Sequence, residues 1–143
     1  MQDDPYNLSR FVEAQDPVYR RVLTELGQGC KTSHWMWFVF PQIEGLGTST
    51  MARRFAISSL EEARAYLQHR VLGPRLEECT RLVWEVSGKT IHEIFGSPDD
   101  MKFRSSMTLF AMAAAKHGIF DDALQKYFAG QKDPLTLEKI GLR

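Results

Sequence analysis

The sequence predicts an all-α fold: one compact domain spanning residues 1–143, with about six to eight helices, several of them short. Its 143 residues are close to the commonest domain size and suffice for one hydrophobic core. Hydrophobic residues make up 43% and charged residues 25%, which is typical of a globular protein. Helix start and stop signals recur along the whole chain, and no two segments form an evident pair of strands.

The N-terminal part predicts two helices. The first is an amphipathic helix that ends before Pro17, because apolar and amide side chains recur at helical spacing at Leu8, Phe11, Val12 and Gln15. Asp16 is then expected to cap the second helix, with Pro17 at its first position and Gly27 at its end.

Capping signals predict the middle helices. Ser58 and Glu61 form a capping box ahead of a helix over about 59–69. Gly73-Pro74 opens the next helix, which ends at Ser87-Gly88. Thr90 and Glu93 form a second capping box, and Gly96 ends that helix after little more than one turn.

The C-terminal part predicts a long helix and two shorter ones. Ser97-Pro98, followed by two acidic residues, opens the long helix, which ends at Lys116-His117-Gly118. Asp121 begins the next helix, which ends at Gly130. Asp133-Pro134 opens the terminal helix.

Six consecutive apolar residues, 35–40, are compatible with a buried helix or a central strand. We predict a buried helix, because a lone strand would leave its backbone groups unpaired. Whether this segment is only core or also part of a binding site stays open at this stage.

Two segments combine polar groups with features that packing alone does not require. In the first, residues 33–47, the indoles of Trp35 and Trp37 are candidates for stacking on a planar ligand, and Gln42 for reading its edge. His34 is a candidate general acid or base because its ordinary pKa is near neutrality. The competing interpretations are core packing for the aromatic residues and helix capping for His34.

The second segment is 95–106. Asp99 and Asp100 are candidate catalytic carboxylates, although capping and the helix dipole also account for acids at a helix start. Three further residues are candidates for binding an anionic group: Lys102, Arg104 and Ser105. The alternative for Arg104 is an ion pair with Asp100, four residues away. Arg53 and Arg54, after a glycine-bearing loop, are a weaker third candidate.

Several classes of function are disfavoured. Lys plus Arg and Asp plus Glu balance at 18 each, so no global charge favours nucleic acid as a partner. Cys30 and Cys79 are isolated and no histidine has metal-ligand spacing, so we expect no metal and no cofactor. The N-terminus lacks a secretory pattern and no apolar run spans a bilayer. We therefore expect a cytoplasmic protein without a membrane partner, as a monomer or weak dimer.

Five stretches together resemble a bacterial family of unknown function, domain-of-unknown-function family 1810, which often carries a calpastatin label: DPYNLSRFVEAQ, SHWMWFVFPQ, MARRFAI, VLGPRLEEC and EIFGSPDDMKFRSSMTLFA. The resemblance covers about Asp4 to Gly130. It implies a small all-helical domain and no particular activity.

A second, more distant similarity is to the helical superfamily associated with ADP-ribose derivatives and an N-glycosidase of the riboflavin pathway. Phe11 to Gln15 resembles the early aromatic helix of that group, and Phe95-Gly96 before a basic helix resembles its aromatic-glycine step. Ser9 stands where that group has an acidic residue, so Asp99 or Asp100 would have to carry the acid-base role. If the chain is an enzyme, this similarity implies a hydrolase acting on an N-glycosidic or ADP-ribose-type bond.

The leading hypothesis is binding, with or without hydrolysis, of a phosphorylated ribosyl or nucleotide-like molecule between the two segments. In it Trp37 stacks on the base and Arg104 holds a phosphate. The alternative is a non-catalytic adaptor whose aromatic segment engages another protein.

Overall fold

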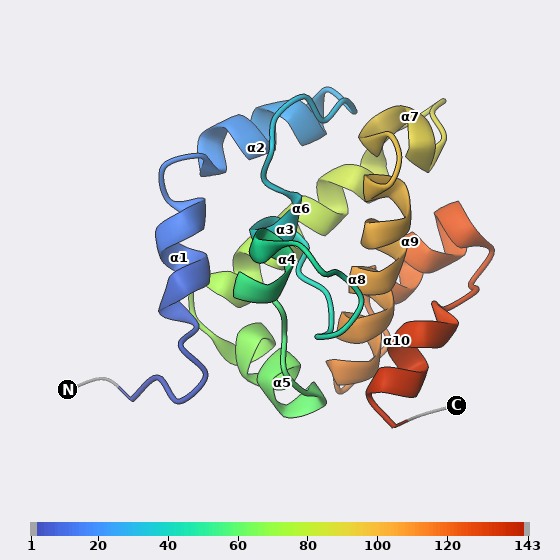
Figure 1. Cartoon of the computed structure of the whole chain (residues 1–143). Coiled ribbons are helices and arrows are strands. Elements are labelled where there is room, and N and C mark those ends of the chain that lie inside the picture. Colours follow the sequence, from blue (N-terminus) through green and yellow to red (C-terminus); the bar gives the residue numbers. More distant parts are fainter. Residues whose placement is uncertain (1–2, 142–143) are drawn as a thin grey trace.

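The computed structural model describes residues 3–141 and confirms the all-α prediction (Figure 1). It contains ten helices within those residues, and six of them have seven residues or more. The only strand-like pairing there is one isolated parallel bridge, between Ile43 and Ile57. No helix in the described part of the chain has the length and apolar character needed to cross a membrane.

Helix α8, Asp99–Ala113, forms the centre of the molecule and packs against α5, α7, α9 and α10. These partners span Leu60–Gln68, Ile91–Phe95, Ile119–Phe128 and Pro134–Lys139. Eight of the fifteen residues of α8 are buried, on more than one face. A helix surrounded by other helices buries residues around its circumference, which explains why its polar residues 105, 106 and 108 are buried too.

The remaining helices surround this centre (Figure 1). Helix α6, Leu72–Glu85, packs on α2, α5 and α9, and α2 spans Tyr19–Gly27. Helix α1, Ser9–Gln15, lies against the short α3, Met36–Val39. Aromatic contacts join these layers: Phe11 contacts Tyr66 with ring centroids 5.1 Å apart, and Tyr66 contacts Phe110 at 5.2 Å.

The segment 35–40 is helical as predicted, over the four residues of α3, and it lies in the core. Five of its six residues are buried, and Trp37 is partly buried. The aromatic ring of Phe40 meets Phe103 of α8 edge to face, with centroids 5.1 Å apart. This edge-to-face packing ties the segment to the central helix.

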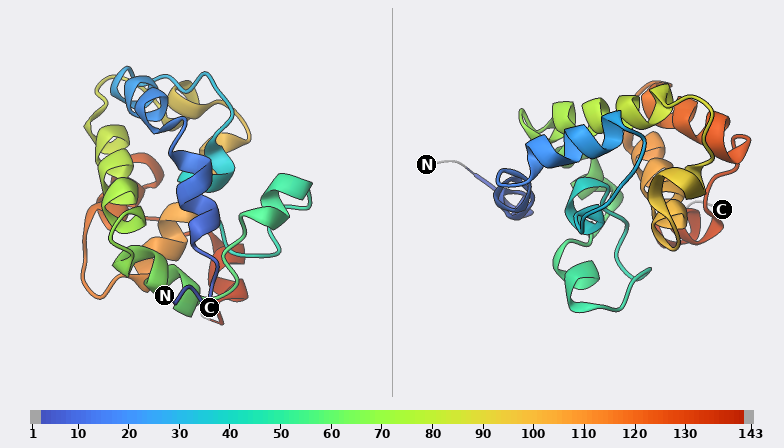
Figure 2. Two further views of the ribbon diagram at one scale, coloured as in Figure 1. Left: turned by 90° about the vertical axis from the view of Figure 1, so that its left-hand side faces the viewer. Right: turned by 90° about the horizontal axis from the view of Figure 1, so that it is seen from above.

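Residues 44–56, which we call the 44–56 loop, project from the body of the molecule (Figure 2). The loop includes α4, Thr50–Arg54, which buries none of its five residues and which the sequence did not predict as a helix. Two backbone hydrogen bonds close its base, from Glu44 to Ile57 at 2.8 Å and from Ile57 to Gln42 at 2.9 Å. Ser49 caps α4 by accepting from the amide of Ala52 at 3.1 Å.

Several predicted helix starts are displaced by one or two residues. Helix α2 begins at Tyr19 after Val18, so Asp16 does not cap it. Ser59, rather than Ser58, caps α5. Helix α9 begins at Ile119, two residues before Asp121, whose carboxylate accepts from the amide of Gly118 at 3.0 Å. The capping box of Thr90 and Glu93 and the Asp133 cap of α10 are confirmed.

Candidate functional site

A groove of about 410 Å³ is lined by the 44–56 loop, the first turns of α8 and the start of α10. It brings together parts of both segments that the sequence singled out, because Gln42 lines it from the first segment and Lys102 and Ser105 from the second. The twelve residues that line this groove are Gln42, Leu46, Gly47, Thr48, Ser49, Ala52, Pro98, Met101, Lys102, Ser105, Asp133 and Leu135.

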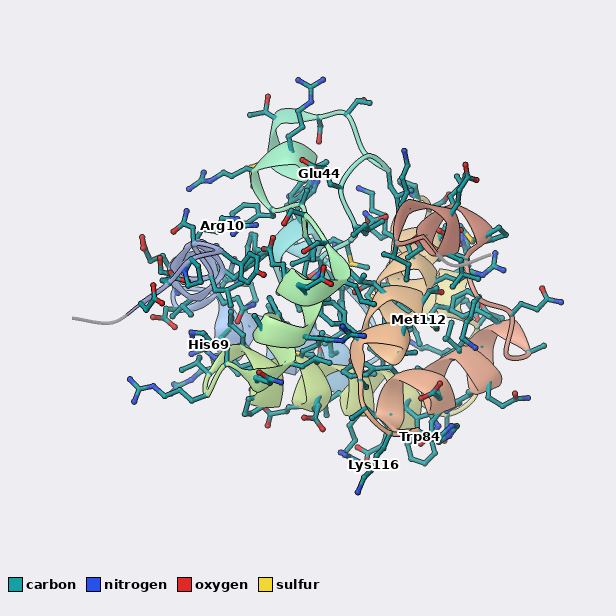
Figure 3. The ribbon with its side chains drawn as sticks, turned by 90° about the horizontal axis from the view of Figure 1, so that it is seen from below. Arg10, Glu44, His69, Trp84, Met112 and Lys116 are labelled. Atoms are coloured by element: carbon teal, nitrogen blue, oxygen red, sulfur yellow. The ribbon has the colours of Figure 1, made fainter. Side chains whose placement is uncertain are left out.

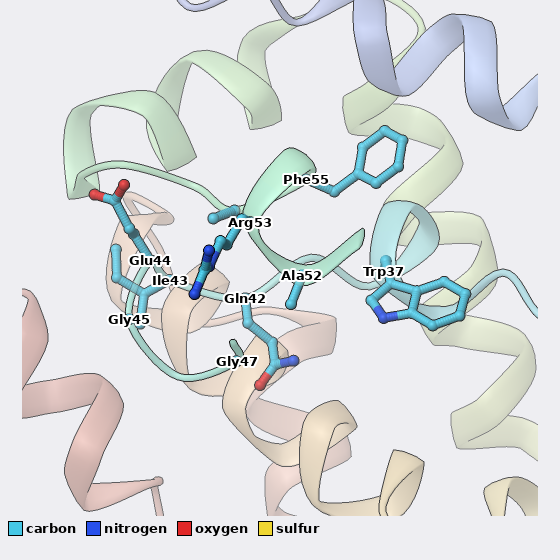
Figure 4. A pocket seen from close by; sticks show the side chains of 10 residues that line it. Trp37, Gln42, Ile43, Glu44, Gly45, Gly47, Ala52, Arg53 and Phe55 are labelled. Carbon is cyan, nitrogen blue, oxygen red and sulfur yellow. The ribbon is translucent and has the colours of Figure 1, made fainter. Parts of the chain in front are cut away.

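A much smaller cavity, of about 50 Å³, lies on the other side of Gln42 and shares Gln42, Gly47 and Ala52 with the groove. Its other walls include Trp37 and Arg53, and Figure 4 shows Gln42 beside Gly47, with Trp37 beyond Ala52. A cavity of this size holds only a few water molecules. The groove is therefore the better candidate for a small-molecule site.

Lys102 is the cation of the groove, and its side chain is 28% exposed. Its ammonium lies 5.6 Å from the ring centroid of Trp37 and 3.7 Å from Asp99. Asp99 is closer to Lys31, at 2.9 Å, and the Lys31 side chain is only 8% exposed. Two cations thus share one carboxylate, so Asp99 compensates the charge of Lys102 only in part.

Asp133 is the carboxylate of the groove. One oxygen, Oδ2, accepts from Thr136 Oγ1 at 2.6 Å, from the Thr136 amide at 3.1 Å and from Ser105 Oγ at 3.2 Å. The backbone amide of Asp133 donates to Thr108 Oγ1 at 2.9 Å. These bonds attach the start of α10 to the face of α8.

The rim of the groove is apolar. Three large hydrophobic side chains are exposed by more than a third among the described residues, and two of them, Met101 and Leu135, line this groove. Exposed apolar side chains that gather at a concavity with a few polar groups are typical of ligand sites.

Trp35 is not placed to bind a ligand, because it is 1% exposed and belongs to the core. Its indole Nε1 donates to Glu25 Oε1 at 2.9 Å. The same carboxylate accepts from the amides of Thr32 and Ser33 and from the Ser33 hydroxyl. Burial raises the pKa of Glu25, but the four hydrogen bonds outweigh it and lower the pKa to about 2.

Arg104 points away from the aromatic segment, which corrects the expected geometry. Its guanidinium donates to the carbonyls of Gln131 and Lys132, at 2.9 and 2.8 Å, and lies 6.0 Å from the ring centroid of Phe128. The alternative ion pair with Asp100 is absent too, since Asp100 accepts instead from His92 Nδ1 at 3.1 Å. Arg104 holds the segment before α10 in place.

The three candidate catalytic residues, Asp99, Asp100 and His34, line neither cavity. Asp99 is paired with Lys31 and Lys102, Asp100 with His92, and His34 is exposed at the start of the aromatic segment. The structure therefore does not bring these three together with the groove. Arg53 lines the small cavity, and Arg54 stacks on Phe55 at 5.1 Å.

Sequence reasoning missed four residues that shape this region: Arg10, Glu25, Lys31 and Asp133. Arg10 bridges the base of the 44–56 loop by donating to the carbonyls of Arg54 and Ala56 at 2.9 and 2.8 Å. The burial of Glu25 could have been predicted from the sequence, because it lies three residues after Val22 on the apolar face of α2. Asp133 was recognised only as a helix cap.

The described residues contain no group of three or more His, Cys, Asp or Glu side chains that could hold a metal ion. No curated protein matches the chain. The crystal structure of the conserved hypothetical protein Rv1873 from Mycobacterium tuberculosis is similar, at 57% sequence identity and a TM-score of 0.95. The match covers 98% of this chain and all of that one.

The family model of a protein of unknown function, DUF1810, matches residues 5–140. This match covers nearly the whole chain, from the residues before α1 to the end of α10. The chain therefore belongs to the DUF1810 family.

Proposed function

We propose that the groove binds a small anionic molecule of the phosphorylated ribosyl class, with Lys102 as the group that attracts the phosphate. The single observation that carries the proposal is the only partly compensated charge of Lys102 at a concave surface. Asp99 compensates Lys31 at 2.9 Å and is more distant from Lys102, at 3.7 Å. A phosphate that approaches Lys102 thus meets a cation whose charge Asp99 compensates only in part.

The other walls of the groove support the same class of ligand. Met101 and Leu135 offer exposed apolar surface, against which a sugar ring or base would pack. Gln42 and Ser49 supply hydrogen-bonding groups at the opposite wall. Trp37 is a less direct partner than expected, because Lys102 lies over its ring and Trp37 lines only the small cavity.

The proposal concerns binding. Hydrolysis of an N-glycosidic or ADP-ribose-type bond requires an acid or base at the reacting atoms, and Asp99, Asp100 and His34 do not line the groove. The choice of ribosyl phosphates as probes follows from the sequence expectation that Phe11 to Gln15 and Phe95-Gly96 resemble a group associated with ADP-ribose derivatives. The adaptor alternative expected a partly exposed aromatic segment; five of the six residues 35–40 are buried, and only Trp37 is partly exposed.

Titration with ribose 5-phosphate and with ADP-ribose, followed by NMR amide shifts, tests the proposal. We expect shifts at residues 42–52, 101–105 and 133–135, and Lys102→Gln should weaken binding about tenfold or more, because a charge-assisted contact is lost. Lys116→Gln is the matched control, since Lys116 is exposed on the side of the molecule opposite Glu44 (Figure 3). No binding by the unaltered protein, or equal weakening in both variants, would overturn the proposal.

A further inference from the structure

The groove contains two opposite charges that are not paired with each other. Lys102 and Asp133 both line it, yet no salt bridge within 4.0 Å joins them in the described part of the chain. Lys102 instead contacts Asp99 and the Trp37 ring, toward the N-terminus of α8. Asp133 lies beside Ser105, about 4.5 Å further along the helix axis at 1.5 Å per residue.

The hydrogen bonds of Asp133 are one-sided. Thr136 donates to Oδ2 through its hydroxyl and its amide, and the single hydroxyl proton of Ser105 is shared between Oδ2 and the Met101 carbonyl, each 3.2 Å away. No side chain or amide of residues 3–141 donates to Oδ1. An ionised carboxylate oxygen accepts about two hydrogen bonds through its lone pairs. One oxygen of this carboxylate therefore serves the fold, and the other retains its full capacity as an acceptor.

The position of Asp133 is fixed by contacts with α8. Its amide donates to Thr108, and Arg104 binds the two carbonyls immediately before it, those of Gln131 and Lys132. A binding group that is held in place before the ligand arrives loses little conformational entropy on binding. Arg104, which does not line the groove, thus holds the backbone immediately before Asp133.

From this arrangement we infer that Asp133 Oδ1 accepts hydrogen bonds from the vicinal hydroxyls of a ribosyl phosphate whose phosphate lies at Lys102. This inference rests on the function proposed above and deepens it. A ribose 5-phosphate unit carries its anionic group at one end and two neighbouring hydroxyl donors at the other, which matches a cation and a free acceptor separated along one groove. A carboxylate that accepts from ribose hydroxyls is an established way for a protein to recognise ribose.

Asp133 is then a specificity-determining residue. A 2-deoxyribosyl phosphate lacks one of the two donors, so it leaves Oδ1 with unused capacity in a partly sheltered site. We expect the unaltered protein to bind ribose 5-phosphate about tenfold more tightly than 2-deoxyribose 5-phosphate, the usual size of one hydrogen bond to a charged group.

The test compares these two probes by NMR titration in the unaltered protein, Asp133→Asn and Lys102→Gln. Asn caps helices about as well as Asp, so the amide oxygen of Asp133→Asn still serves Thr136, while its NH₂ replaces Oδ1, the oxygen without an internal donor. We expect Asp133→Asn to abolish the preference, so that the two probes bind with about equal affinity. Lys102→Gln should weaken both probes and leave the preference unchanged.

Equal affinity for the two probes in the unaltered protein would overturn the inference and leave the proposed function standing. A preference that persists in Asp133→Asn would also overturn it. If the unaltered protein binds neither probe, the proposed function fails together with the inference. The preference of the unaltered protein does not depend on any variant, so the inference is tested even if Asp133→Asn does not fold.

Discussion

The segment 31–40, which lines the small cavity through Trp37, and the 44–56 loop, which lines the groove, are held by different means. The first contains α3, most of which is buried, and its preceding turn is bound by Glu25 and by the Lys31–Asp99 ion pair. The second contains α4, none of which is buried, and its hydrogen bonds to the rest of the molecule lie mainly at its base. Two single-turn helices of similar length thus differ in whether tertiary structure supports them.

In this region the buried segment contributes to stability, whereas the exposed loop supplies a surface for binding. Short helices are marginal in isolation, so α3 depends on core packing, and α4 depends on its Ser49 cap and the closed base of the loop. The rigid segment fixes Trp37 and the start of α8, whereas the loop supplies one wall of the groove. Binding surfaces are commonly carried by loops on a rigid scaffold.

Hydrogen exchange should show the largest contrast. The amides of Val39 and Phe40 donate within the buried segment, and those of Arg53 and Phe55 donate within or next to α4. We expect the first pair to exchange at least about a thousandfold more slowly, because opening the core costs several kcal/mol more than opening an exposed turn. Native-state exchange read by NMR measures this, and similar protection at both sites would show that the loop is as stable as the core.

Replacement of Glu25 should be the most destabilising change in this comparison. Its pKa falls from an ordinary value near 4.5 to about 2, which corresponds to roughly 3 kcal/mol of stability above pH 4.5. Glu25→Gln removes the charge and leaves some of the four donors poorly paired. We therefore expect the free energy of unfolding at pH 7 to fall by about 3 kcal/mol, measured by urea denaturation.

The contribution of Glu25 to the free energy of unfolding should depend on pH. The folded-state pKa of Glu25 is depressed, so its contribution is fully present above about pH 4.5 and is lost as the pH falls toward 2. The difference between the unaltered protein and Glu25→Gln should shrink over that range. Glu77→Gln, at an exposed position of α6, is the control and should leave stability and its pH profile nearly unchanged. A difference that is constant with pH would contradict the role assigned to the Glu25 charge.

Gly47→Ala should have the smallest effect on stability and a selective effect on binding. A Cβ at residue 47 would lie 2.6 Å from the Cβ of Ala52, so the 44–56 loop must shift. Because this loop is outside the core, we expect a change of less than about 1 kcal/mol in unfolding free energy. Affinity for ribose 5-phosphate should fall roughly fivefold, because one wall of the groove moves.

A second substitution checks the cause of the Gly47→Ala effect. Ala52→Gly removes the methyl group that Gly47→Ala would strike, so the double variant should regain affinity relative to Gly47→Ala alone. Ala52→Gly by itself measures the cost of the glycine in α4. If the double variant binds as weakly as Gly47→Ala, the close contact with Ala52 is not the cause.

Local sequence signals were enough to predict the all-α fold class and most helix ends. Thr90 with Glu93, and Asp133 with Pro134, form caps from groups only a few residues apart, so their chemistry can be read along the chain. The start of α2 differs from the prediction, because the helix begins at Tyr19 after Val18, which makes no side-chain cap, rather than at Asp16-Pro17.

The sequence alone also determined that the two segments around Gln42 and Lys102 carry unusual polar groups, and tertiary structure decided which of those groups meet. Lys102 and Arg104 are two residues apart on one helix, so they leave it in different directions: Lys102 toward the groove and Arg104 toward Gln131 and Lys132. Asp133 reaches the same groove from 28 residues beyond Ser105. Composition and spacing record which side chains are present, whereas a contact over that sequence distance depends on how α10 packs against α8.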